Sequence, residues 1–323
     1  MSGTLPSRPR LKPWYRLLHR EGKVLLQYGE NLVSFEGRAA ERLLPALLPL
    51  LDGTRLVDEI VEIVGPAVRP AVERALALLD EHELLTDPAP DVVAESEWRS
   101  AEFLSATDPL GRSGAELIEI VRAADVAVAG SGPLAAETAS SLRRSGVRDP
   151  GRLGLGTTSS ELEHFQLVLV VPSGEELPAL PAWNAAALAA GVPWLQLLPF
   201  DGLLAAVGPL YVPGDTGCYV CFRTRRAANV DYGADFLALQ EVRQRLPAAA
   251  SLEQTVAGLA ATLALRWLAH RDQFLPGTWY ALELSMQPAL GAHVLHRVPR
   301  CPACSGLGAA AQPLPWDRGA RAA

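Results

Sequence analysis

All four cysteines of this 323-residue chain lie in two Cys-x-x-Cys pairs. Cys218 and Cys221 stand in GCYVCF, and Cys301 and Cys304 stand in RCPACS. Two thiolates three residues apart in a tight turn reach one metal ion together, and a second such turn completes tetrahedral coordination by sulfur. Because four protein thiolates leave no position for water or substrate, the spacing predicts a structural zinc that joins distant parts of one domain. Redox-active pairs and an iron–sulfur cluster are the alternatives.

A glycine turn at residues 130–132 is the second candidate site. It follows the apolar run 125–129 and precedes a helical pattern, as in nucleotide-binding α/β proteins. Pro133 removes an amide that a phosphate would use, and Ala135 stands where the third glycine is expected. No acidic residue ends the next run to bind a ribose, and FQLVLVV ends without a carboxylate for magnesium. We therefore expect no ATP binding at this turn.

No residue is predicted to be catalytic. Glu161, Glu163 and His164 offer acid and base groups, but their spacing fits a solvent-exposed face equally well. Every thiol is occupied if the zinc is present. The motifs therefore favour a binding protein over an enzyme.

Composition limits the class of protein. The chain is 49% hydrophobic with a net charge of −7, so we predict a globular protein whose bulk charge repels nucleic acid and anionic membranes. No apolar run is long enough to cross a bilayer, and the N-terminus lacks the core of a signal peptide. These features predict a cytoplasmic protein with reduced thiols. The oligomeric state stays open, a homodimer included.

The first part of the chain is predicted to be a small winged-helix-like domain over residues 11–88. Residues 1–10 are rich in Pro, Ser and Arg, which predicts a flexible tail. β-Type runs, two of which flank the hairpin signal Gly29-Glu30, predict strands at 14–18, 23–28 and 31–36. Apolar residues at three- and four-residue steps predict helices over 39–51, 54–64 and 70–82.

The rest of the chain is predicted to be a doubly wound α/β domain over residues 99–306. A Pro-rich and then acidic segment at 89–98 predicts a linker before it. Buried strands at 125–130, 165–171 and 192–198 alternate with helices at 134–145 and 182–190, a pattern typical of parallel sheets. Residues 307–323 are rich in Ala, Gly and Pro, which predicts a disordered tail.

Both halves resemble known families. The segments LLPLLDGTRLVDEIVEIVG and ALALLDEHELLTD resemble the PqqD-like recognition elements of ribosomal peptide-modification systems. The segments VAVAGSGPLAAETASSLRRSGV, GPLYVPGDTGCYVCFRTRR and RCPACSG resemble the ThiF-like half of leader-peptide-binding partners of YcaO cyclodehydratases. This resemblance implies a non-catalytic subunit that captures a precursor's leader peptide and presents it to a separate ATP-dependent YcaO enzyme, which forms thiazoline or oxazoline rings.

A peptide-binding groove is expected between the strand 31–36 and the helix 70–82. An edge strand offers unpaired amides and carbonyls to which an extended peptide can add. We predict that the leader contacts the strand and the third helix, although the apolar helix residues fit a purely structural core nearly as well. The predicted contact residues are Leu32, Val33, Ser34, Phe35, Arg69, Val72, Glu73 and Leu76.

Two other functions stay open. A ThiF-like enzyme would activate a carboxylate with ATP, which requires phosphate contacts at residues 130–132. A winged-helix regulator would place the helix 70–82 on DNA, but Arg74 is outnumbered there by Glu73, Asp80 and Glu81. Because phosphates repel acidic side chains, the charge of this helix argues against DNA binding.

Overall fold

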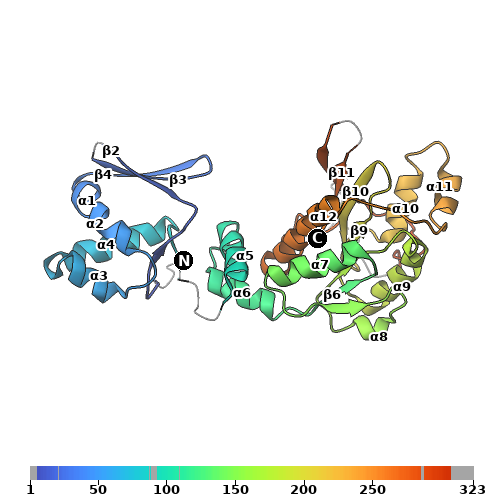
Figure 1. Ribbon diagram of the computed structural model, residues 1–323, viewed down its shortest axis with the longest axis horizontal. Helices are drawn as coiled ribbons and strands as arrows, with labels where there is room; N and C mark the ends of the chain where they lie inside the picture. Colours follow the sequence, from blue (N-terminus) through green and yellow to red (C-terminus); the bar gives the residue numbers. More distant parts are fainter. Residues whose placement is uncertain are drawn as a thin grey trace, which may run out of the picture. The chain divides into compact units, whose positions relative to one another are not determined.

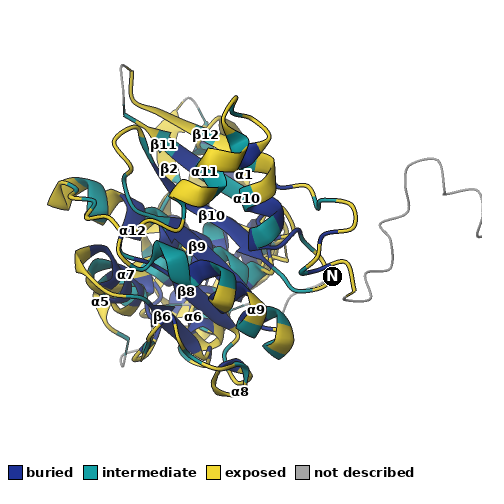
Figure 2. Ribbon diagram, turned by 90° about the vertical axis from the view of Figure 1, so that its right-hand side faces the viewer, coloured by how far each residue is buried: buried dark blue, intermediate teal, exposed yellow. Residues whose placement is uncertain are grey.

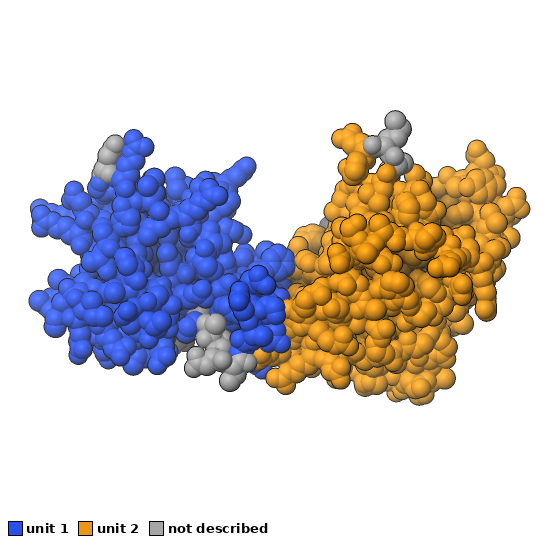
Figure 3. Space-filling model, in the orientation of Figure 1, with its two compact units in different colours: residues 1–119 blue, residues 120–323 orange. Residues whose placement is uncertain are grey.

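The computed structural model describes residues 6–20, 22–86, 88, 93–108, 110–284 and 287–306. The chain divides into two compact units, residues 1–119 and 120–323 (Figure 3). Residues 1–5 and 89–92 and the whole predicted tail 307–323 lie outside the described residues. Across the described ranges, no helix is long and apolar enough to cross a membrane.

Unit 1 contains a three-stranded antiparallel sheet, built from β2 (Arg16–Arg20), β3 (Lys23–Tyr28) and β4 (Asn31–Glu36) in the order β2-β3-β4. The predicted hairpin is confirmed, because Tyr28 pairs with Asn31 across a turn in which Gly29 has φ 55°. This left-handed conformation suits glycine, which has no Cβ. Since β4 pairs only with β3 among the described strands, its other edge is free.

Helices cover one face of this sheet. The predicted helix 39–51 is instead three short pieces, because Pro45 and Pro49 each start a new turn rather than continue the previous one. Asp52 accepts hydrogen bonds from the amide and hydroxyl of Thr54, so the second helix begins later than predicted. The helices are α1 (Arg38–Arg42), α2 (Leu44–Leu47), η1 (Leu48–Leu50), α3 (Val57–Val64), η2 (Pro66–Val68) and α4 (Arg69–Glu81).

The core of unit 1 lies between the sheet and these helices. Leu26 from β3, Ile60 from α3 and Leu76 from α4 are fully buried within it. A two-stranded ribbon closes the unit, in which β1 (Arg10–Leu11) pairs with β5 (Leu85–Thr86). The predicted tail 1–10 therefore extends too far, because Arg10 is already part of a strand.

Two further helices, α5 (Glu95–Ala106) and α6 (Gly114–Arg122), follow. The predicted linker is too long, since α5 begins inside it and Trp98 packs against Ala101 and Ile118. Glu102 of α5 accepts hydrogen bonds from Trp98 Nε1 and from Arg10 Nη1 at 2.8 and 2.7 Å. These contacts place α5 in unit 1, whereas the sequence analysis assigned residues 99–119 to the second domain.

Unit 2 is built on a seven-stranded sheet with the order β12-β11-β10-β9-β8-β6-β7. Figure 1 labels β6, β9, β10 and β11 of this sheet. Four neighbouring strands are parallel, as predicted for a doubly wound fold, and three antiparallel strands extend one side. The strands are β6 (Val126–Ala129), β7 (Gly151–Leu153), β8 (Leu167–Val170), β9 (Trp194–Leu198), β10 (Leu204–Tyr211), β11 (Thr278–Glu283) and β12 (Ala289–Val294).

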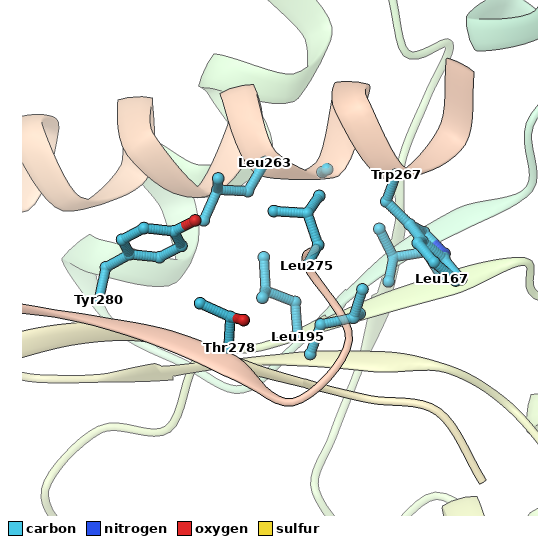
Figure 4. A pocket seen from close by; sticks show the side chains of 9 residues that line it. Leu167, Leu195, Leu263, Trp267, Leu275, Thr278 and Tyr280 are labelled. Carbon is cyan, nitrogen blue, oxygen red and sulfur yellow. The ribbon is translucent and has the colours of Figure 1, made fainter. Parts of the chain in front are cut away.

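Helices cover both faces of this sheet, so that its central strands are buried (Figure 2). The neighbours α7 (Pro133–Arg144) and α12 (Ala250–His270) cover one face. Leu167 and Leu195 meet Leu263 and Trp267 of α12 there, around a gap of only 10 Å³ (Figure 4). The remaining helices are α8 (Ser159–Leu162), η3 (Leu177–Ala179), α9 (Leu180–Ala190), α10 (Tyr219–Ala227) and α11 (Gly233–Leu239).

Candidate functional site

The four cysteines come together in a buried cluster, as predicted from their spacing. Cys218 and Cys221 lie at the start of α10, and Cys301 and Cys304 lie in the turn that follows β12. Their sulfur atoms all lie within 4.8 Å of one another. The cluster belongs to the core that packs between the sheet and α9 and α10.

The sulfur separations match those of a tetrahedral metal site. The Sγ atoms of Cys218 and Cys301 are 3.8 Å apart, those of Cys221 and Cys304 are 3.7 Å apart, and those of Cys218 and Cys221 are 4.0 Å apart. Zinc–sulfur bonds of about 2.3 Å put the corners of a tetrahedron about 3.8 Å apart, whereas a disulfide joins sulfurs at about 2.05 Å. The cluster can therefore hold a metal ion such as zinc.

Hydrogen bonds within the cluster already favour one thiolate. The thiol of Cys218 and, despite burial, the amide of Val298 lower the pKa of Cys221 to about 4. Burial raises the pKa of Cys304 to about 11. Because four metal-binding thiolates together carry four negative charges, a bound cation is what would balance the full set.

Two arginines and one asparagine hold the cysteine turns in place. Arg225 of α10 donates to the carbonyls of His296 and Arg297 at 2.5 and 3.0 Å. Arg297 donates back across the cluster to the carbonyls of Gly214 and Thr216 at 2.9 and 3.0 Å. Each arginine therefore joins the segment that carries one cysteine pair to the segment that carries the other through hydrogen bonds. The buried Asn184 side chain also accepts the amide of Tyr219 at the start of α10.

The glycine turn lies at the topological switch point of the sheet. The strand that follows β6 in the chain, β7, pairs with one side of β6, and the next strand, β8, pairs with the other side. The order of the strands therefore reverses between β6 and β8, at the ends where the glycine turn lies. Ligands of doubly wound folds bind at this position. Gly130 has φ 120°, and a Cβ there would clash with the Val171 carbonyl at the end of β8. Glycine is therefore required for the close approach of these two strand ends, whether or not a ligand binds.

A carboxylate of the chain itself occupies this turn. Glu176 Oε2 accepts the amide of Ser131 at 3.0 Å and the amide and hydroxyl of Ser173 at 2.9 and 3.0 Å. Burial raises the pKa of Glu176, but the hydrogen bonds from Ser173 and Ser131 outweigh it and hold the pKa below its ordinary value. Amides at such a turn are the donors that bind a phosphate. A nucleotide would therefore have to compete with a fixed negative charge.

A later segment also lies over the loop that follows β8. The amide of Gln244 donates to the Gly174 carbonyl at 3.4 Å, and a Cβ on Gly174 would meet the Gln244 carbonyl and the Leu246 side chain. The backbone of the segment thus packs directly on this loop. Sequence analysis identified neither this contact nor Glu176.

A groove lies at the C-terminal end of β4 in unit 1. It has a volume of 220 Å³ and lies between the end of β4, α1 and α4. Its walls are mainly apolar, and Arg74 and Glu36 supply the charge. The residues that shape it include Phe35, Ala39, Ala71, Arg74, Ala75 and Leu78.

A groove does lie between the end of β4 and α4, but α4 lines it with other residues than those predicted to contact the peptide. Val72 and Leu76 are 0% exposed and pack in the core, so the prediction that they line the groove is wrong. Arg69 is exposed and pairs with Asp58 and Glu73, and neither Arg69 nor Glu73 is among the residues that line the groove. Both sets of residues follow the helical repeat, so periodicity alone does not tell them apart. The groove is bordered by Ala71 and Arg74, each of which precedes a residue of the buried face.

The predicted strand residues divide between the two faces of the sheet. Val33 and Phe35 pair with buried residues of β3 and point inward, and Phe35 reaches the groove. Leu32 and Ser34 lie on the other face, and Leu32 is 60% exposed. Among the described strands, β4 therefore has one unpaired backbone edge, and Leu32 is an exposed apolar side chain on it.

The fold is shared with enzymes of peptide natural-product biosynthesis. No protein-family model matches the sequence, and no curated protein matches it. The heterocyclase TruD is 26% identical over 93% of this chain, with a TM-score of 0.70. A heterocyclase solved with substrate and cofactor is 24% identical over 92% of this chain, with a TM-score of 0.71. This chain covers 43% and 39% of those two chains.

The E. coli microcin C7 biosynthetic enzyme MccB has a similar fold at lower sequence identity. It is 13% identical, with a TM-score of 0.59, over 92% of this chain and 99% of that chain. Solved forms of MccB include complexes with ATP and with N-formylated MccA. These similarities confirm the predicted ThiF-like fold, and they concern the fold alone.

Proposed function

We propose that this protein is a non-catalytic leader-peptide-binding subunit with a PqqD-like first unit. It captures a ribosomal precursor peptide and presents it to a separate ATP-dependent YcaO cyclodehydratase that forms azoline rings. The observation that carries this proposal is the apolar groove at the C-terminal end of β4, a strand whose other edge is free among the described strands. An extended peptide that pairs with β4 gains backbone hydrogen bonds, and every second side chain enters the groove.

The likeness to a heterocyclase supports a role in ring formation. This chain spans 43% of the TruD chain. In this proposal the ring-forming step is carried out by a separate polypeptide. The precursor peptide and a YcaO enzyme are therefore its proposed partners, without nucleic acid or membrane. The proposed place of work is the cytoplasm.

Unit 2 serves in this proposal as a scaffold rather than as an adenylating enzyme. Glu176 competes with phosphate at the glycine turn, which supports a function without ATP. The zinc proposed at the cysteine cluster is structural, since four thiolates satisfy a tetrahedral ion. It would join α10 to the chain that follows β12.

Leader binding is tested by fluorescence anisotropy with the full-length, zinc-loaded protein and the labelled precursor peptide encoded beside its gene. Ala71→Glu places a charged side chain in the groove, while Ala77→Glu changes an exposed position of α4 that does not line it. We expect micromolar or tighter binding by the native protein and by Ala77→Glu. We expect binding by Ala71→Glu to be at least about 10-fold weaker, a loss of about 1.4 kcal/mol.

Equal affinity of the native protein and both variants would refute the groove. Absence of binding by the native protein would instead favour the adenylating enzyme. In that case the isolated protein should catalyse ATP–pyrophosphate exchange, which the subunit proposed here does not.

A further inference from the structure

A small polar pocket in unit 2 has a lining that shares no residue with the glycine turn. It is found at the carboxyl end of β9, beneath α10 and α11. Its volume is 10 Å³, which admits about one oxygen-sized group. Its lining includes Gln196, Leu198, Phe222, Arg223, Arg226 and Phe236.

Gln196 brings an unpaired donor to this pocket. Its side chain is 0% exposed, and its Oε1 accepts a hydrogen bond from the Tyr211 hydroxyl at 2.6 Å. Its Nε2 is buried and has no hydrogen-bond partner among the described residues. Because an unsatisfied buried amide costs free energy, this donor is suited to a ligand that enters the pocket.

Arg223 supplies a second buried donor. Its Nη2 donates to the Leu237 carbonyl at 3.1 Å and to Glu241 at 2.8 Å, which fixes the guanidinium. Its Nε is buried and, within the described part of the chain, has no acceptor. Glu241 neutralises the charge of Arg223. Arg223 therefore offers the pocket an oriented N–H donor but no excess positive charge.

Arg226 supplies the unmatched positive charge. Its guanidinium lies 5.6 Å from the ring centre of Phe222 and 5.3 Å from that of Phe236. Contacts of this kind hold a guanidinium against aromatic rings without neutralising it. Over the residues that the structure describes, Arg226 has no carboxylate partner. The pocket therefore combines a held cation with two buried N–H donors.

We propose that this pocket binds a carboxylate group. One carboxylate oxygen fits the inner space and accepts from Gln196 Nε2 and Arg223 Nε, while the second faces Arg226 at the mouth. The group can belong to a free small acid or to a peptide, and binding at this pocket does not depend on leader capture in unit 1.

The test follows side-chain N–H signals of the full-length, ¹⁵N-labelled and zinc-loaded protein by NMR. Sodium acetate is titrated against sodium chloride at constant ionic strength. We expect shifts of the Gln196 amide and the Arg223 Nε–H signals, with an acetate affinity at least about 10-fold weaker in Arg226→Gln. Arg148→Gln removes an exposed arginine far along the chain from the pocket residues and should bind acetate like the native protein.

A second titration separates the source of the carboxylate. Shifts with N-acetyl-aspartate amide as well as acetate would support a peptide carboxylate, and shifts with acetate alone would support a free acid. Equal shifts with N-acetyl-asparagine amide, or no shift of Gln196 with acetate, would overturn the proposal. Arg226→Lys keeps the charge and should retain part of the affinity, which an effect on folding would not explain.

Discussion

Replacing Glu176 by alanine should destabilise unit 2 at neutral pH and open the glycine turn to anions. Three hydrogen bonds from Ser131 and Ser173 converge on one oxygen of this carboxylate. Buried hydrogen bonds to a charged group contribute about 1.5–3 kcal/mol each, but Glu176 is partly exposed and solvent screens it. We therefore expect a total loss of about 1–2 kcal/mol, or about 2–8 °C in the Tm of a unit of this size.

The loss should depend on pH in a defined direction. The pKa of Glu176 lies below its ordinary value of 4.5 in the folded protein, so its contribution is fully present above the unfolded pKa. It disappears as the pH falls through the folded pKa. Scanning calorimetry should therefore show a difference between the native protein and Glu176→Ala at about pH 7 that shrinks as the pH falls below the unfolded pKa and through the folded pKa.

Glu175→Ala is the matched control, since Glu175 is the exposed neighbour. It should leave the Tm and the pH profile unchanged. Isothermal titration with pyrophosphate should detect tighter binding to Glu176→Ala than to the native protein. Equal stability of Glu176→Ala at neutral pH, or equal pyrophosphate binding by both proteins, would show that this carboxylate does not occupy a phosphate position.

Further predictions concern the metal cluster and the core. Cys301→Ser should reduce bound zinc from about one ion per chain and lower the Tm of unit 2, as measured by elemental analysis and calorimetry. Arg297→Gln removes the hydrogen bonds to Gly214 and Thr216 and should weaken zinc at least about 10-fold against a chelator, whereas unchanged affinity would exclude a supporting role. Leu76→Ala should cost about 2–5 kcal/mol in urea unfolding, because its side chain is fully buried; a negligible loss would contradict its place in the core.

The elements with strong periodicity could be predicted from the sequence. The helix predicted over 70–82 is α4, and the pairing of 23–28 with 31–36 is observed residue for residue. Weakly patterned segments were not recognised. β12 reads Ala-Leu-Gly-Ala-His-Val and is exposed along most of its length, so burial imposes no alternation on it.

The candidate sites differ in how far local sequence determines them. A tetrahedral metal ion needs four ligands, and one Cys-x-x-Cys turn supplies two of them. This requirement predicted a cluster formed by cysteines 83 residues apart. Glu176 reaches Ser131 across 45 residues only because β6 and β8 are neighbours in the sheet. On α4, periodicity identifies the buried stripe, but only the packed helix shows that Ala71 and Arg74 face the groove.

Hydrogen–deuterium exchange of the full-length protein with its precursor peptide tests the central claim most directly. A peptide that adds to the sheet must protect backbone amides on the free edge of β4. We expect slower exchange over Asn31–Glu36 and along the groove face of α4, with Arg16–Arg20 at the opposite edge unchanged. Protection of β2 instead of β4, or no protection in unit 1 at saturating peptide, would contradict leader capture at this strand.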